Sequence, residues 1–81
     1  MTNPPYYVTA REIAKKLSNC GHSDWSVRIE DAIRSASTGT ELAMSIRWNF
    51  RELLDSGIKL DKGIESQIIE LNRKITKDLK P

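Results

Sequence analysis

The sequence predicts an all-α protein, a compact four-helix bundle or orthogonal helical domain built around a central helix over residues 39–56. Apolar residues recur at the helical period in four segments, start and stop signals flank these segments, and no segment alternates with the period of a strand. The 81 residues are short enough to form one domain, residues 1–81. We expect helices over about 9–20, 24–36, 39–56 and 62–79, after an N-terminal extended arm over 1–8.

The first helix is expected to follow the arm directly. Pro4 and Pro5 favour an extended entry, and Thr9 with Glu12 three residues later fits a capping box. Gly21 is a typical helix stop. The stripe that should face the core is Ala10, Ile13, Ala14, Leu17 and Cys20.

The second helix also shows a one-sided apolar stripe. Ser23 or Ser26 is a suitable N-cap, and Val27 points away from the stripe. The stripe residues are Trp25, Ile29, Ala32, Ile33 and Ala36.

The central helix has signals at both of its ends. Thr38 with Glu41 fits a capping box, and Gly57 fits a left-handed C-terminal cap. Its core face would comprise Leu42, Ala43, Ile46, Phe50, Leu53 and Leu54.

The last helix is predicted to begin after Asp61, a suitable N-cap. Ile69 lies about 100° away from the apolar stripe of this helix. The stripe residues are Ile64, Ile68, Leu71, Ile75 and Leu79.

The outer side of the central helix carries the main functional signal. Met44 and Trp48 lie one turn apart there, among Arg47, Arg51 and Asp55. Methionine adapts to irregular surfaces, and tryptophan and arginine often anchor protein interfaces. These five residues are the candidate partner-binding site, unless another part of the chain covers them. An exposed patch of this kind also allows a two-fold homodimer.

Composition gives little indication of a charged partner. The 13 basic and 11 acidic residues interleave, for a net charge of +2. The one cysteine excludes an internal disulfide and favours a reducing compartment. No uninterrupted apolar run exceeds three residues, and the first residues do not resemble a signal peptide, so we expect a cytoplasmic protein without a membrane partner.

No residue pattern predicts catalysis. Cys20 and His22 have only Asp24 nearby as a third metal ligand, and the helix phase places Cys20 in the core. We therefore expect no metal, no cofactor and no enzyme activity. The adjacent carboxylates Glu30 and Asp31 are explained by a surface ion pair with Arg34.

A second carboxylate pair has the same explanation. Glu52 and Asp55 are expected to form surface ion pairs with Arg47 or Arg51.

Nucleic-acid binding is the alternative function. Arg47, Trp48 and Arg51 combine cations with an aromatic ring, which suits phosphate contact and base stacking. The basic C-terminus adds Arg73, Lys74, Lys77 and Lys80. These groupings are interrupted in the sequence by Glu52, Asp55, Glu70 and Asp78.

The preferred hypothesis is a small cytoplasmic module that binds another protein. Small helical proteins without a catalytic set often act stoichiometrically, as bacterial immunity or antitoxin-type inhibitors and regulatory partners do. This part of the prediction is an analogy with a class of proteins and does not come from particular residues.

Overall fold

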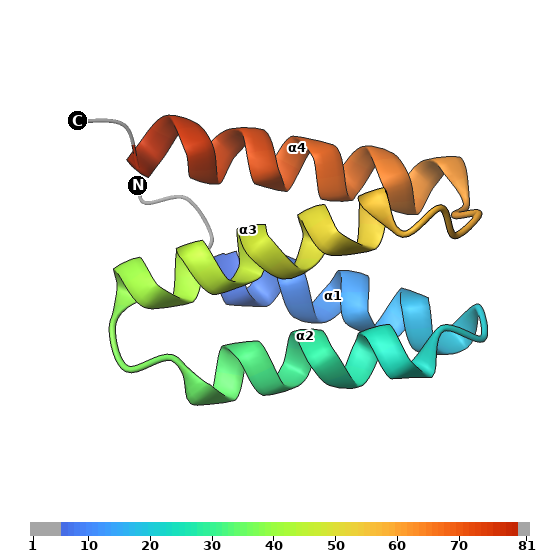
Figure 1. The fold of residues 1–81 in the computed structure, drawn as a ribbon, viewed down its shortest axis with the longest axis horizontal. Helices are drawn as coiled ribbons and strands as arrows, with labels where there is room; N and C mark the ends of the chain where they lie inside the picture. The colour runs from blue at the N-terminus through green and yellow to red at the C-terminus, as the bar shows by residue number, and fades with distance from the viewer. Residues whose placement is uncertain (1–5, 80–81) are drawn as a thin grey trace.

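A computed structural model describes residues 6–79 of the chain, which form four helices. They are α1 (Tyr6–Asn19), α2 (Ser23–Ser35), α3 (Gly39–Asp55) and α4 (Lys62–Leu79). Consecutive helices run in alternating directions (Figure 1). Residues 6–79 contain no strand, so the predicted all-α bundle is confirmed. None of these helices has the length and apolar character needed to cross a membrane.

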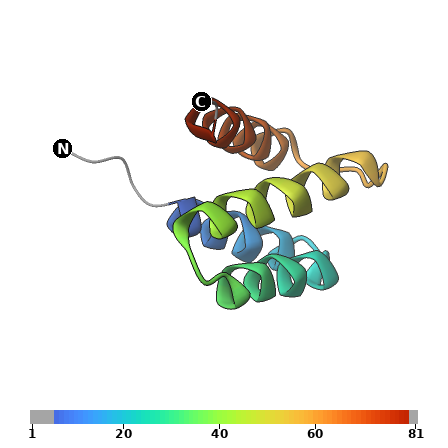
Figure 2. The same cartoon turned by 60° about the vertical axis from the view of Figure 1, so that its left-hand side comes forward.

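The helices are not equivalent in their packing. Both α1 and α3 contact all three other helices, whereas α2 and α4 do not contact each other within the described residues. The turned view shows α2 and α4 on opposite sides of α3 (Figure 2). The predicted central position of α3 is therefore confirmed, and α1 shares it.

The core is aliphatic apart from one phenylalanine and draws on all four helices. Each fully buried leucine, isoleucine or phenylalanine side chain contributes roughly 1.5–3 kcal/mol to folding. The buried residues are Ala10, Ile13, Ala14, Leu17, Ile29, Ala43, Ile46, Phe50, Leu53, Ile64, Ile68, Leu71 and Ile75. Only Ile29 comes from α2, whose Trp25 and Ile33 are partly buried at the edge of the core.

The predicted ends of the two later helices are confirmed. The Thr38 hydroxyl accepts a hydrogen bond from the Glu41 backbone N–H at 3.1 Å. The Asp61 carboxylate accepts one from the Gly63 N–H, also at 3.1 Å, directly before α4. Gly57 has φ +80° and ends α3 in the left-handed conformation, which favours glycine.

The predicted start of the first helix is wrong. Helix α1 already begins at Tyr6, so residues 6–8 do not form an extended arm and Thr9 is not an N-cap. The predicted arm's first five residues lie outside the described part of the chain. Two anchors hold the extra turn in place: Tyr6 packs against the core, and its hydroxyl donates a hydrogen bond to Asp78 of α4. Tertiary contact has overridden the local capping signal.

The hydrogen bond to Asp78, followed by burial and the negative charge of Asp78, raises the pKa of Tyr6 to about 12. A second contact between α1 and α4 is the hydrogen bond from Lys16 Nζ to Gln67 Oε1, at 2.7 Å. These polar contacts fasten the first helix to the last one.

The start of α2 also differs from the prediction. Neither Ser23 nor Ser26 caps the helix, because His22 occupies the N-cap position without a side-chain hydrogen bond. The Ser26 N–H donates instead to the His22 carbonyl at 3.1 Å.

The end of α1 places Cys20 differently from the prediction. The helix stops at Asn19 and the chain reverses through Gly21, which has φ +87°. Cys20 is therefore exposed in a turn and is not part of the core stripe.

Candidate functional site

The outer face of α3 carries two large apolar side chains in solvent. Trp48 is 62% exposed and Met44, one turn earlier, is 51% exposed. No other part of residues 6–79 covers them, so they are surface residues on a helix whose opposite face supplies Ile46 and Phe50 to the core. Together with Arg47 and Arg51 they line a shallow hollow of about 330 Å³, here called the Trp48 surface.

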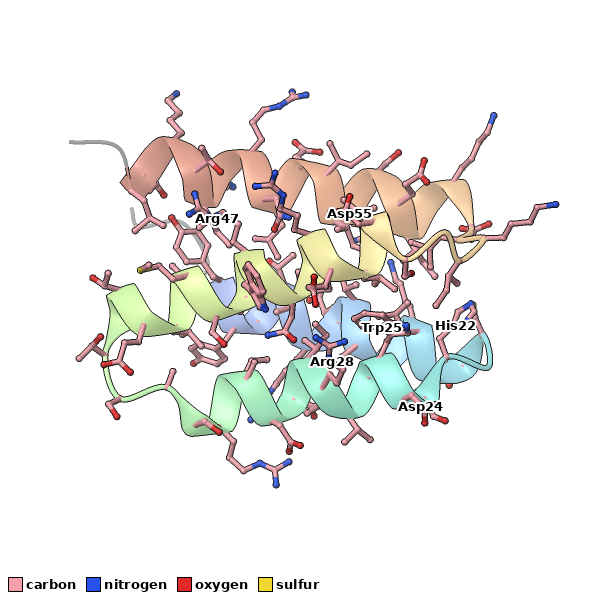
Figure 3. All side chains as sticks on the ribbon, viewed as in Figure 1. His22, Asp24, Trp25, Arg28, Arg47 and Asp55 are labelled. Carbon is pink, nitrogen blue, oxygen red and sulfur yellow. The ribbon has the colours of Figure 1, made fainter. Side chains whose placement is uncertain are left out.

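A groove of about 560 Å³ lies beside the Trp48 surface, between α3 and α4. The two features share part of their lining, because Arg47 and Arg51 line both of them. Figure 3 shows Arg47 extending from α3 toward α4. The lining of this α3/α4 groove is Arg47, Arg51, Ile69, Asn72, Arg73, Thr76 and Lys77.

The groove lining contains four positive side chains and no carboxylate. We call them the groove cations: Arg47, Arg51, Arg73 and Lys77. None of them forms an ion pair with an acidic residue among residues 6–79, where the ion pairs join Arg11 to Glu30 and Arg28 to Glu52. The structure thus gathers positive charge that the described chain does not neutralise locally.

Three of the acidic residues that interrupt the basic groupings in the sequence point elsewhere. Glu52 lies 3.8 Å from Arg28 of α2, on the other flank of α3. Glu70 lines a separate hollow with Tyr6 of α1, and Asp78 accepts the Tyr6 hydrogen bond. In the folded chain these three carboxylates therefore do not lie among the groove cations.

Asp55 belongs to the predicted partner-binding set but lines neither hollow. It is exposed at the C-terminal end of α3 (Figure 3). The structure thus brings together four of the five predicted site residues and leaves Asp55 apart. Lys80 of the predicted basic C-terminus lies outside the described residues.

The ion pairs predicted within single helices are wrong. Glu30 pairs with Arg11 of α1 at 3.4 Å and not with Arg34, and Glu52 pairs with Arg28 and not with Arg47 or Arg51. Packing between helices offers each carboxylate a cation on the neighbouring helix.

Arg28 is also the main polar link between α2 and α3. Its guanidinium lies 4.3 Å from the ring centre of Trp25 and donates to Asn49 Oδ1 at 3.2 Å. Figure 3 shows Trp25 and Arg28 together in the space between these two helices. Arg28 is thus occupied by structural contacts, in contrast to the groove cations.

Two hydrogen bonds cross the α3/α4 groove. Arg47 Nη1 donates to Thr76 Oγ1 at 3.3 Å, and Asn72 Nδ2 donates to the Arg47 carbonyl at 3.4 Å. The other amide atom, Asn72 Oδ1, is buried without a hydrogen-bond partner in the structure. The two polar residues of the groove are therefore turned toward Arg47.

Cys20 and His22 do not line the same hollow within residues 6–79. Cys20 lines a hollow with Lys16 and Asp61, and His22 is not part of that lining. His22 and Asp24 lie at the end of the bundle where α1 connects to α2 (Figure 3). Within residues 6–79, no group of three His, Cys, Asp or Glu side chains is placed to hold a metal ion.

Sequence reasoning noted Arg73 and Lys77 but did not join them to Arg47 and Arg51. The joining depends on the antiparallel pairing of α3 with α4 across the connection at residues 56–61. Counting residues from that connection does not find them, because Arg51 and Arg47 lie 5 and 9 residues before residue 56, whereas Arg73 and Lys77 lie 12 and 16 residues after residue 61. Ile69, whose position about 100° from the stripe would either widen the apolar face or leave it exposed, is 43% exposed and lines the groove.

Comparison of the chain with protein families, with curated proteins and with solved structures finds no match.

Proposed function

We propose that this chain is a small protein-binding module that acts stoichiometrically on its partner. The observation that carries the proposal is the exposure of Trp48 on a helix whose other face is fully used by the core. Tryptophan and arginine are the side chains that most often dominate binding energy at protein interfaces. Here Trp48 is flanked by Arg47 and Arg51 and has Met44 one turn away.

The Trp48 surface combines the properties of an interface centre. Met44 can adjust to an irregular partner surface, and the indole brings a large apolar area with one N–H donor. Because the two arginines have no ion pair within residues 6–79, a partner carboxylate does not need to displace an internal one. Truncating a tryptophan anchor of this kind typically lowers the binding free energy by about 2 kcal/mol or more.

In this proposal the chain works in the cytoplasm without enzymatic chemistry or a cofactor. It occupies its partner as an inhibitor or regulator, in the manner of bacterial immunity or antitoxin-type proteins. Self-association is a second form of protein binding. A two-fold dimer centred on the groove is disfavoured by charge, because it would bring two sets of groove cations together.

Capture by the immobilised chain tests the proposal. Trp48→Ala should fold normally and lose a partner that the unaltered chain captures. The matched control is Val27→Ala, because Val27 is 58% exposed on α2 and belongs to neither surface. The captured protein is then purified, and binding is measured by calorimetry, with one-to-one stoichiometry expected. Equal binding by the Trp48→Ala variant would overturn the proposal.

Nucleic-acid binding is the second candidate, and the groove cations, which form no ion pair within residues 6–79, favour it together with Trp48. Such binding predicts a steep fall in affinity with added salt. Passage of the chain through heparin and DNA columns at low salt without retention would eliminate this candidate.

A further inference from the structure

We propose that the α3/α4 groove binds an acidic amphipathic helix of the partner protein. This inference rests on the proposed protein-binding function and specifies the chemistry of the partner. The helix would direct its carboxylates to the groove cations and its apolar stripe to Ile69 and the Trp48 surface.

The lining of the groove is positively charged. Four cations surround a groove of about 560 Å³, and no carboxylate lines it. Like charges held close together repel each other, and three of the acidic residues that lie near the groove cations in the sequence, Glu52, Glu70 and Asp78, make their contacts on other flanks. An anionic occupant would remove the repulsion and gain attraction to all four groups.

The groove cations are spaced by turns of their helices. Arg47 and Arg51 are separated by one turn of α3, and Arg73 and Lys77 by one turn of α4. One turn rises about 5.4 Å, which is also the separation of carboxylates placed four residues apart on a partner helix. A helix lying along the groove can therefore present a carboxylate pair to each cation pair.

Exposed apolar side chains lie in the groove and on the neighbouring Trp48 surface. Ile69 of α4 is 43% exposed and lines the groove, and Met44 and Trp48 line the hollow on α3 that shares Arg47 and Arg51 with it. An amphipathic helix docks by placing an apolar face in such a groove. Highly charged ligands without an apolar stripe would leave these three side chains unused.

The same residues argue against nucleic acid as the occupant. Asn72 and Thr76, the groove's neutral polar residues, each share a hydrogen bond with Arg47, and the remaining amide oxygen of Asn72 is buried, which limits their contacts with bases. The cation pairs extend over a single helical turn, and the whole chain carries a net charge of only +2. The experiment therefore includes a nucleic-acid probe, so that binding of nucleic acid would be detected.

The experiment uses a designed helical peptide of roughly 20 residues, a length that can remain helical in water. It carries Glu at positions four apart and a Leu stripe on the adjacent face. Three comparison probes are the same peptide with Lys replacing Glu, an acidic peptide with Ser replacing Leu, and an oligothymidine of equal length. Binding is followed by Trp48 fluorescence in the full chain carrying Trp25→Phe, so that only one tryptophan reports.

We expect the acidic amphipathic peptide to bind more tightly than the other three probes. Arg51→Glu combined with Lys77→Glu should weaken its binding about tenfold or more. The matched control is Lys15→Glu with Lys59→Glu, because both lysines are exposed outside the groove and the change in net charge is the same. The control should bind like the parent.

Circular dichroism checks the fold of each variant, and Arg51→Gln with Lys77→Gln provides a milder pair if the reversal disturbs it. Tighter binding of the oligothymidine overturns the inference in favour of nucleic acid. Equal weakening by the groove pair and the control pair overturns it as well. A captured partner that requires Trp48 but ignores the groove pair leaves the proposed function standing and refutes the acidic helix, whereas indifference to Trp48→Ala refutes the function itself.

Discussion

Arg47 of α3 and Thr76 of α4 face each other across the groove, where the guanidinium donates a hydrogen bond to the threonine hydroxyl at 3.3 Å. This contact and the hydrogen bond from Asn72 Nδ2 to the Arg47 carbonyl join the two helices that carry the groove cations. The lateral position of α4 on α3 thus determines whether the positive side chains form one surface or two.

Truncating Trp48 should leave the fold almost unchanged. The side chain is 62% exposed, so Trp48→Ala is expected to lower the free energy of unfolding by less than about 1 kcal/mol. Phe50→Ala should cost about 3–5 kcal/mol, because Phe50 is completely buried. Urea denaturation of both variants measures the difference. A loss of several kcal/mol in Trp48→Ala would show that the indole belongs to the core.

Neutralising groove cations should not destabilise the protein. Arg51→Gln and Lys77→Gln each remove a charge that has no ion pair within residues 6–79, and each should leave the free energy of unfolding unchanged or raise it by a few tenths of a kcal/mol. Arg28→Gln is the contrast. It should cost about 1–2 kcal/mol through the lost contacts with Trp25 and Asn49. Thermal unfolding at low salt distinguishes the two cases, and marked destabilisation by Arg51→Gln would contradict the description of the groove.

The bond from Tyr6 to Asp78 predicts a pH dependence at alkaline pH. The pKa of Tyr6 is raised from 10.0 to about 12 in the folded chain. Below pH 10 the hydroxyl is protonated in both states and its full contribution to stability is present. Between pH 10 and pH 12 the unfolded chain loses the proton more readily, so the contribution falls as pH rises.

Tyr6→Phe is the control for this effect, because all other titrations are shared. The difference in urea midpoint between the parent and Tyr6→Phe should be constant from pH 7 to pH 9 and should shrink above pH 10. A difference that grows with pH would have the wrong sign for this hydrogen bond.

Two glycines at the ends of α3 should respond oppositely to alanine. Gly57 has φ +80°, so Gly57→Ala should cost about 1 kcal/mol. Gly39 has an ordinary φ and open space around its Cα, so Gly39→Ala should be neutral or stabilise by up to about 1 kcal/mol. Thermal denaturation of the two variants tests this assignment of the helix ends, and equal effects would refute it.

The sequence predicted the fold well where local signals and burial agree. The cap residues Asp61 and Thr38 precede strongly periodic stripes, and both helices begin where these residues indicate. The pair Thr9 and Glu12 gave an equally good signal in the wrong place. The contacts of Tyr6 with the core and Asp78 come from residues distant in sequence, which no local pattern contains.

The candidate site was predicted only in part for a similar reason. Periodicity placed Met44 and Trp48 opposite the core face, but whether another helix covers that side depends on the packing of α1 and α4. Arg51 and Lys77 line the same groove because α3 and α4 pack antiparallel in one particular register. Both features depend on tertiary packing. Packing brings together cations that acidic residues separate in the sequence, and the groove lining is therefore positive only.

The most direct test of the account is the quenching of Trp48 fluorescence by iodide and by caesium, measured in the Trp25→Phe variant. An uncovered indole beside Arg47 and Arg51 should be quenched efficiently by iodide and much less by caesium, because the local charge attracts the anion and repels the cation. Added inert salt should reduce this preference. An indole protected from both ions, or quenched equally by the two, would contradict the claim that α3 presents an exposed and positively charged docking surface.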